Sequence, residues 1–363
     1  MSRLMVSLGL VAGVACAGPQ ATPPTDTTPP AAETPPAVVA PPVAEAPPAE
    51  APASQLIVVS ANFDSDAPCG KRDGAGCDLY AVQYSPEQEA VVSVTRLLDT
   101  PGVAEQFPTV DREQQFVVYT EQRGRALSLQ ALHIPTGTRH ALVEGGRYAS
   151  FSPTASELVY SSVQRARGKT KAPAQKEVSL GSYASDGGRL SLSGVQVISQ
   201  GRDPQFSPDG RQVVFHVRPP SEETRPAVYD LDQGKVSLME GARGCAHTTF
   251  SQDGQTVFCG EGAQVHTYPR SADGWGARNA WTAPTLPARF GGDCRFTSMS
   301  FPDFCPNGQD AVFSVGCHDG GATRFSQVLL VDMATQDVVD LHGLIEDFLG
   351  VSGKASRSAD CAG

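Results

Sequence analysis

Charged and aromatic side chains are scarce in this sequence. Of its 363 residues, 18% are charged and 7% are aromatic, whereas glycine and proline contribute 36 and 29 residues. This composition predicts a turn-rich β protein rather than a helical one. The net charge of −11 argues against a protein that binds nucleic acid through its phosphates, so we expect no nucleic-acid partner.

Several signatures of enzymes and metal sites are also missing. The sequence contains no G-x-S-x-G, no P-loop and no G-x-G-x-x-G. It has no C-x-x-C pair, which disfavours a zinc site. After residue 16 no apolar segment is long enough to span a membrane. Any catalytic site would therefore need residues that are distant in the sequence.

The first residues, MSRLMVSLGLVAGVACAG, have the pattern of an export signal. Arg3 supplies a positive charge, and Leu4–Ala15 is an apolar stretch of 12 residues, too short for a spanning helix. Residues 13–16, GVAC, resemble the lipobox of bacterial lipoproteins, whose cysteine is lipidated. Residues 15–17, ACA, fit ordinary secretion instead. The short signal and the segment after it favour the lipoprotein, with a signal peptide over 1–15 and a lipid on Cys16.

A proline-rich segment follows, over residues 16–54. Between residues 17 and 54 it has twelve prolines and no lysine, arginine or aromatic residue. Such a segment cannot bury a core, so we expect an extended, mobile tether whose reach at ~3.1 Å per residue is on the order of 100 Å. It would hold a domain off a membrane of the cell envelope. The absence of aspartate after Cys16 favours the outer membrane, facing the periplasm or the exterior.

One phrase recurs after residue 100. It combines an aromatic residue, a turn and a short β-rich run, and is most complete in PQFSPDGRQVVF at 204–215. Related phrases are ASFSPTASELVY at 149–160 and TTFSQDGQTVFC at 248–259. The aromatic anchors, spaced by 44 to 55 residues, are Phe107, Phe151, Phe206, Phe250 and Phe301. Tight turns follow two of them, at Asp209-Gly210 and Asp253-Gly254, where glycine tolerates positive φ.

Further β-rich runs follow each anchor, so that six units of about four strands fill residues 55–349. Four short strands that recur at this period predict a β-propeller, because one unit cannot bury both its faces alone. The first unit lacks an anchor strand, which residues 51–55 or 344–349 could supply. Sharing a blade between the two ends of the chain would leave no free edge strand. Residues 350–363 are expected to form a C-terminal tail.

The F-S-P-D-G turn followed by x-x-V-V-F is similar to the Pro-Asp repeat of TolB-type six-bladed propellers. The resemblance covers about 290 residues and is strongest over 206–215. It implies an all-β fold of six four-stranded antiparallel blades, in which the anchor phenylalanines pack between blades. The unit at Phe151 lacks Asp-Gly, and the sixth unit carries an insertion. TolB has an N-terminal α/β domain where this chain has its tether, so the resemblance implies the fold rather than the family's trans-envelope role.

Nine cysteines in an exported chain predict disulfides. With Cys16 lipidated, eight remain, and their places in the repeat suggest the partners. Two pairs lie on neighbouring strands of the fifth and sixth units, one pair flanks a glycine-rich loop, and the last would join the tail to the last blade. The predicted pairs are Cys245 with Cys259, Cys294 with Cys317, Cys69 with Cys77, and Cys305 with Cys361.

Candidate ligand-binding residues are few. Asn62, Asp64 and Asp66 place oxygen ligands at alternate positions that could hold calcium, with Asp73 or Asp78 completing the shell, although a solvated turn between two strands explains them better. Candidates for a site at the channel mouth are His216, His247, His266, and His318 beside Asp319. The basic stretch at 165–176, RARGKTKAPAQK, predicts a solvated hairpin loop or a surface for an acidic partner.

A rigid ring with variable loops suits recognition. We therefore expect a monomeric, non-enzymatic envelope lipoprotein whose propeller binds a protein or glycan partner, with no cofactor beyond the calcium considered above. The alternative is an enzyme of the lyase or glycoside hydrolase type with its site in the central channel. Three or more Asp, Glu or His side chains converging on the channel would favour the enzyme, and a channel lined by small and apolar groups would favour binding.

Overall fold

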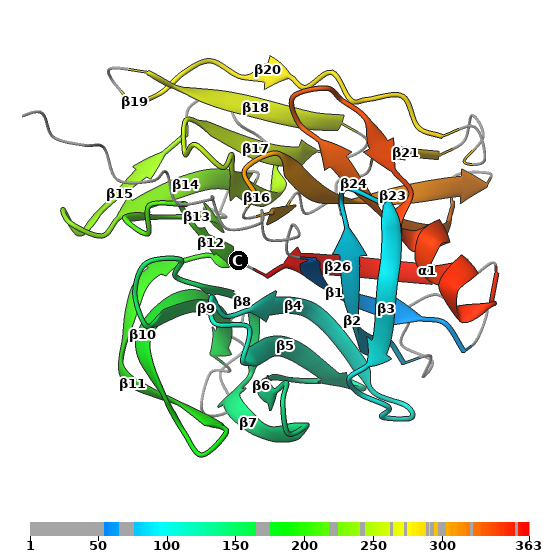
Figure 1. The fold of residues 1–363 in the computed structure, drawn as a ribbon. Coiled ribbons are helices and arrows are strands. Elements are labelled where there is room, and N and C mark those ends of the chain that lie inside the picture. Colours follow the sequence, from blue (N-terminus) through cyan, green and yellow to red (C-terminus); the bar gives the residue numbers. More distant parts are fainter. Residues whose placement is uncertain are drawn as a thin grey trace, which may run out of the picture. The chain divides into compact units, whose positions relative to one another are not determined.

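The computed structural model describes residues 54–64, 76–164, 175–217, 224–239, 244–261, 264–271, 274–287, 290, 294–296, 303–305, 307–319, 322–352 and 355–362. Its strands form six antiparallel sheets arranged as a ring (Figure 1). This confirms the predicted all-β, six-bladed propeller. In the described part of the chain, no helix combines the length and apolarity that a bilayer crossing requires. The predicted signal peptide, Cys16 and the tether up to residue 53 lie outside the described residues.

Each sheet is one blade, whose strands succeed one another from the channel outward. Blade 1 contains β26 (Ala355–Cys361), β1 (Gln55–Asn62), β2 (Asp78–Ser85) and β3 (Ala90–Arg96). Blade 2 contains β4 (Ala104–Val110), β5 (Phe116–Arg123), β6 (Ala126–His133) and β7 (Thr138–Glu144). Blade 3 contains β8 (Gly146–Phe151), β9 (Glu157–Gln164), β10 (Gln175–Asp186) and β11 (Arg189–Gln200).

The remaining blades follow in chain order. Blade 4 contains β12 (Arg202–Phe206), β13 (Gln212–Val217), β14 (Arg225–Asp230) and β15 (Lys235–Leu238). Blade 5 contains β16 (Ala246–Phe250), β17 (Thr256–Glu261) and β18 (Gln264–Ser271), and both β19 (Gly274–Trp275) and β20 (Asn279–Ala280) pair with β18. Blade 6 contains β21 (Cys294–Phe296), β22 (Asp303–Phe304), β23 (Asp310–Asp319), β24 (Ala322–Asp332) and β25 (Val338–Val339). Its inner strand is split into β21 and β22, where the sequence has its insertion.

A strand from the C-terminal end of the chain closes the ring. β26 pairs antiparallel with β1, so blade 1 combines both ends of the folded domain (Figure 1). This corrects two expectations, because the segment predicted to be a tail supplies the inner strand, and residues 344–349 do not. Those residues belong to the helix α1 (Leu341–Leu349). The Asp340 side chain accepts the N–H of Gly343 at the start of α1, and Gly350 ends it with a φ of 68°.

The pairing of the innermost strand with the next strand identifies one equivalent residue in every blade. It is the last residue of the innermost strand, and we call its place the anchor position. It is occupied by Val110, Phe151, Phe206, Phe250, Phe304 and Cys361. The prediction of Phe107 as an anchor is therefore wrong by three residues, because Val110, opposite Val117 in the pairing of β4 with β5, holds the anchor position of blade 2. Phe301 lies outside the described residues, and Phe304 holds the anchor position of blade 6.

Hydrophobic clusters hold the blades together. Five of them join neighbouring blades directly, and Phe151, Phe206 and Phe250 each lie in one such cluster. The sixth joins blade 6 to the segment after β20, through Trp281 and Phe290. Burying one phenylalanine contributes about 1.5–3 kcal/mol, so the anchors explain much of the ring's cohesion. The cluster between blades 6 and 1 also takes in α1.

Hydrogen bonds explain why the turn sequence recurs. Ser207 Oγ accepts the N–H of Gln212 (2.9 Å) and donates to Asp209 Oδ1 (2.6 Å), which accepts the N–H of Arg211 (3.0 Å). Gly210 between them has a φ of 69°, where a side chain would be strained. Blade 5 repeats the arrangement at Ser251, Asp253 and Gly254. The phrase therefore fixes the turn that leads from an inner strand into the next strand.

Candidate functional site in the central channel

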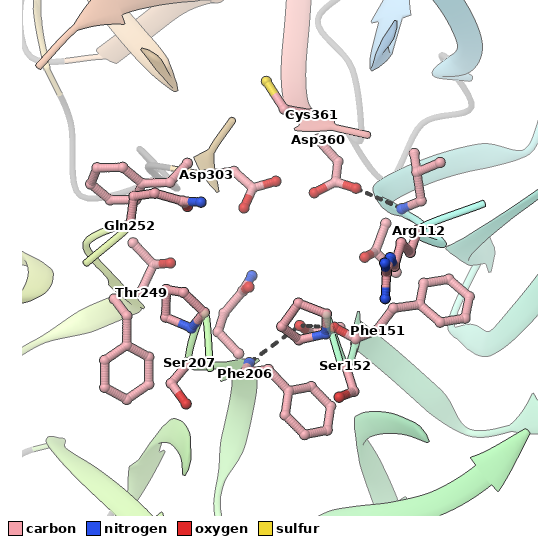
Figure 2. Close-up of a pocket in the computed structure, with 18 residues that line it drawn as sticks. Arg112, Phe151, Ser152, Phe206, Ser207, Thr249, Gln252, Asp303, Asp360 and Cys361 are labelled. Atoms are coloured by element: carbon pink, nitrogen blue, oxygen red, sulfur yellow. Dashed lines mark hydrogen bonds between the residues drawn. The ribbon is translucent and has the colours of Figure 1, made fainter. Parts of the chain in front are cut away.

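A ring of polar side chains surrounds one end of the channel. Each belongs to the residue directly before the anchor position. Because successive side chains on a strand point to opposite faces, this side chain points away from the core in which the anchor is buried. The six residues of this polar ring are Thr109, Ser150, Gln205, Thr249, Asp303 and Asp360. Figure 2 shows Thr249, Asp303 and Asp360 arranged around one space.

The polar ring ties neighbouring inner strands together. The Asp360 carboxylate accepts the N–H of Val110 (2.6 Å), and Ser150 Oγ accepts the N–H of Phe206 (3.3 Å). Asp303 accepts the N–H of Cys361 in the same way. In each of these three bonds, the accepting side chain belongs to the residue directly before the anchor of one blade. The donating N–H belongs to the anchor residue of the blade that follows. Inner strands present an open edge to the channel, and polar side chains at this position supply the acceptors that this edge needs.

Asp303 and Asp360 form an acid pair within the polar ring. Their side chains lie beside one another on the channel wall (Figure 2) and interact by a hydrogen bond. Burial, followed by the charge of Asp303, raises the pKa of Asp360 well above its ordinary value, and burial also raises the pKa of Asp303. Two carboxyl groups in contact cannot both ionise readily. We infer that the pair shares one proton.

A cavity of about 230 Å³ opens at this end of the channel, and we call it the mouth cavity. The polar ring and the anchors form its wall. Its rim consists of the turns that follow the inner strands, with Arg112, Pro153, Pro208 and Gln252 among them. Figure 2 shows how residues from separate blades converge at this cavity. Because all six blades contribute, the shape of the cavity depends on the closed ring rather than on one loop.

A second layer of side chains lies three residues before the anchor position. Phe107, Tyr148, Asp203 and His247 all have a positive φ there, between 49° and 58°. In each blade the pairing of the first two strands is irregular at this point, as at a β-bulge. These four residues, with Ser358 of β26, form the bulge ring. Residues other than glycine seldom have a positive φ. Because it occurs at the same position in four blades, the positive φ is a regular feature of the blade geometry.

Asp203 holds a buried charge in the bulge ring. Its side chain is 2% exposed, and His216 Nδ1 and Arg202 Nε each lie 3.5 Å from its Oδ2, with His247 Nδ1 at 3.8 Å. Burial alone would raise the pKa of Asp203, but the interactions with His216, His247 and Arg202 outweigh it and lower the pKa to about 2. The bulge ring therefore contains a carboxylate that stays ionised near neutral pH.

The histidines that the sequence analysis placed at the channel mouth lie in different parts of the structure. His216 and His247 join the Asp203 cluster. His266 lies on β18, outside the inner strands, where its Nε2 is 2.5 Å from Arg278 Nη2. His318 and Asp319 lie on β23, and their side chains are outside the described set. Within the described residues, no group of three or more His, Cys, Asp or Glu is arranged to hold a metal ion.

Three channel aspartates were missed by the sequence analysis. Asp203, Asp303 and Asp360 all border one narrow cavity of about 30 Å³ inside the channel. For Asp303 and Asp360 a signal was present, because every residue directly before an anchor is polar, but it is visible only when all six anchors are aligned correctly. Asp203 lies three residues before its anchor and carries no such signal. Three carboxyl groups at the channel meet the condition that we set for the enzyme alternative.

The acidic loop considered for calcium is partly described. Asp64 lies 2.8 Å from Arg96, which also pairs with Asp78 and with Asp99 (3.0 Å). One guanidinium thus supplies positive charge to two of the proposed ligands. Asn62 is buried at the end of β1, and Asp66 lies outside the described residues. The calcium site stays a prediction.

Two of the predicted disulfides are present, Cys245 with Cys259 and Cys305 with Cys361. The second links the end of β22 in blade 6 to β26 in blade 1, and so reinforces the closure of the ring. Cys77 is disulfide-bonded, and its predicted partner Cys69 lies outside the described residues. Cys294 and Cys317 are opposite one another in the β21–β23 pairing, and their bond stays a prediction.

Solved structures share this architecture. TolB from Acinetobacter baumannii is 15% identical, with a TM-score of 0.55, over 85% of this chain and 66% of that one, so the chain spans just under two thirds of that protein. A TolB-type structure from Agrobacterium tumefaciens is 13% identical, with a TM-score of 0.50, over 79% of this chain and 87% of that one. A chain of a nidogen/laminin complex is 9% identical, with a TM-score of 0.52, over 85% of this chain and 98% of that one.

No protein-family model matches the sequence, and no curated protein matches it. At these identities the structural likeness concerns the fold alone. The chain therefore has a TolB-like six-bladed propeller fold, as the Pro-Asp repeat predicted, and its function must be argued from its own residues.

Proposed function

We propose that this chain is a non-enzymatic binding module of the cell envelope, whose propeller binds a protein or glycan partner at the mouth cavity. The observation that carries the proposal is the contribution of all six blades to this one cavity. Pairing of β26 with β1 and the Cys305–Cys361 disulfide close the ring around it. A preorganised rim reduces the ordering cost of binding, which suits a recognition surface.

The N-terminal pattern completes the proposal. A lipid on Cys16 would anchor the chain, and the tether over 16–54 would hold a monomeric propeller off the outer membrane, on its periplasmic or exterior side. Ordinary secretion is the alternative, because the ACA sequence at 15–17 also fits a cleavage site.

In-cell crosslinking followed by affinity recovery tests this function. The full-length protein is compared with a Cys16→Ser variant and with residues 1–54 alone. We expect one envelope component to be recovered in near-stoichiometric amount with the propeller, less of it with Cys16→Ser, and none with the tether. Recovery of the same component by the tether alone, or of none by the propeller, would refute the proposal.

Acid–base catalysis in the channel is a second candidate function, favoured by the acid pair and by Asp203 beyond it. A pair that shares one proton contains both an acid and a base. The two carboxyl groups are in contact, however, whereas glycoside hydrolases separate theirs by about 5 Å or more. Asp303 and Asp360 also bind backbone N–H groups, which gives them a structural role. Binding is therefore the better-supported function.

Turnover assays on envelope polysaccharides test the catalytic alternative. Activity that is lost in Asp303→Asn while the thermal midpoint is retained would establish it. Turnover that Asp303→Asn retains in full would contradict a catalytic role for the acid pair.

A further inference from the structure

A second cavity lies at the opposite end of the channel from the mouth cavity. Its volume is about 670 Å³, and it is bordered by the starts of β4 and β8 and by the hairpin between β5 and β6. We call it the arginine bowl, after Arg125 and Arg147. Phe107 and Tyr148 line both the bowl and the narrow inner cavity, so these two rings separate the bowl from the acid pair.

Hydrogen-bond donors in the bowl lack partners. Arg147 Nε and Nη2 are buried, and within the described residues neither has an acceptor. Gln106 is 3% exposed as a residue, and its Nε2 also has no acceptor among the described residues. Buried donors in folded proteins are nearly always hydrogen-bonded. Three such donors border one cavity, and an acceptor bound in that cavity would satisfy them.

The guanidinium of Arg147 is held in place for such a ligand. Its Cζ lies 4.8 Å from the centroid of the Tyr148 ring, and that ring packs against Phe107 with centroids 4.4 Å apart. A planar guanidinium presents Nε–H and Nη2–H side by side, a geometry that matches the two oxygens of a carboxylate. Arg125, exposed at the rim, adds a second positive charge.

We propose that the arginine bowl binds an acidic sugar through its carboxylate. Thr120 and Gln122 line the bowl beside Arg147 and offer a hydroxyl and an amide, which suit sugar hydroxyl groups. The volume falls within the range of roughly 300–1,000 Å³ typical of small-molecule pockets. The net charge of −11 disfavours a long polyanion, so we expect a short saccharide with few carboxylates.

An acidic peptide fits less well. Peptides commonly add a strand to an open sheet edge or lay apolar side chains into a groove. The strands that border the bowl, β4, β5, β6 and β8, are interior to their blades or face the channel, and Leu127 is the one aliphatic side chain among its described lining residues. The bowl thus offers hydrogen bonds and charge rather than an edge or an apolar groove.

Calorimetric titration with matched saccharides tests the proposal. Cellobiouronic acid and cellobiose differ only in the carboxylate, and a triglutamate peptide represents the peptide alternative. We expect the acidic disaccharide to bind at least about tenfold more tightly than either of the others. Arg147→Lys, which keeps the charge but loses the planar fork, should weaken that binding about tenfold, and Arg125→Ala about threefold.

Arg123→Ala is the matched control. Arg123 lies on the same hairpin and carries the same charge, but it pairs with Glu121 (2.7 Å) and does not line the bowl. Its variant should bind as the wild type does.

Four results would each overturn the proposal. They are equal binding of cellobiose, preferential binding of triglutamate, absence of binding, and an equal loss in Arg123→Ala and Arg125→Ala. Arg125 is exposed, so its variant keeps the test valid even if Arg147→Lys unfolds. The result is independent of whether a partner binds at the mouth cavity.

Discussion

The junction between blades 3 and 4 and the junction that closes the ring use the same positions for different chemistry. Between blades 3 and 4, Phe206 is buried among aliphatic side chains and its N–H bonds to the Ser150 hydroxyl. At the closure, Cys361 holds the anchor position, is bonded to Cys305, and follows the titratable Asp360. At the closure, a covalent bond and charged side chains therefore take the place of the aromatic anchor that joins blades 3 and 4.

Removing the closing strand should have the largest effect. A chain that ends after residue 352 lacks β26, the disulfide to Cys305 and Asp360, and exposes the edge of β1 to other molecules. We expect loss of cooperative unfolding and aggregation, measured by urea denaturation and size-exclusion chromatography. A truncated protein that stays monomeric and unfolds within about 1 kcal/mol of the intact chain would refute this account of closure.

The two described disulfides should differ in their effect on stability. Cys305 and Cys361 are 56 residues apart, whereas Cys245 and Cys259 are 14 apart. Chain-entropy arguments assign roughly 4 kcal/mol to the longer loop and roughly 3 kcal/mol to the shorter one. Double Cys→Ser variants, compared by chemical denaturation, measure the difference. A larger loss for the pair in blade 5 would indicate that closure does not depend on the covalent bond.

The anchor position separates two phenylalanines that look alike in sequence. Phe206→Ala should lower the free energy of unfolding by about 3 kcal/mol or more, because it leaves a cavity between two blades. Phe107→Ala should cost about 1 kcal/mol or less, since its partly exposed ring lines the channel. Denaturation curves of both variants measure this contrast. Equal losses would mean that the anchor positions are assigned incorrectly.

The smallest effect concerns pH at two equivalent polar-ring positions. The raised pKa of Asp360 means that the folded state holds its proton more tightly than the unfolded state, so its contribution to stability is complete below about pH 4 and is lost as the pH rises toward its folded pKa. Asp360→Asn should flatten that decline and change stability at pH 7 by on the order of 1 kcal/mol, because an amide can still accept the N–H of Val110. Ser150→Ala should cost about 1 kcal/mol at every pH.

Glu105 provides the control for the pH experiment. Burial raises its pKa to about 8, so it adds a decline of the same sign between its ordinary value and pH 8. Unfolding curves from about pH 4 to 8 for Glu105→Gln and Asp360→Asn separate the two contributions. If Asp360→Asn follows the same pH profile as the wild type, the acid pair does not titrate as described.

The sequence predicted much of the fold because its strongest signal is local. Ser207, Asp209 and Gly210 fix a turn through hydrogen bonds within six residues, and such turns at a regular spacing imply blades. The closing strand escaped prediction because ASRSADC at 355–361 carries no anchor aromatic and no turn of this kind. Its place is set by pairing with β1 and by a distant cysteine, which local patterns do not report.

The site was predicted less well for a related reason. Phe107 followed by proline has the same sequence pattern as an anchor. In the structure, however, Phe107 lies at the β-bulge, and its aromatic side chain lines the channel. Once Val110, Phe304 and Cys361 are recognised as anchors, the polar residue before every anchor becomes visible, and the acid pair with it. His216 and His247 lie beside Asp203 rather than at the mouth cavity, and their proximity to Asp203 depends on a register that the sequence does not reveal.

Site-specific photo-crosslinking in cells tests the central claim, that the mouth cavity is the partner-binding face, most directly. A photoreactive residue replaces Gln252 at the rim of the cavity, and a control variant carries it at Gln88, an exposed turn position between β2 and β3 that does not line the cavity. We predict one discrete adduct from position 252 and none from position 88. An adduct from position 88 without one from position 252 would contradict the account and place the binding face elsewhere on the ring.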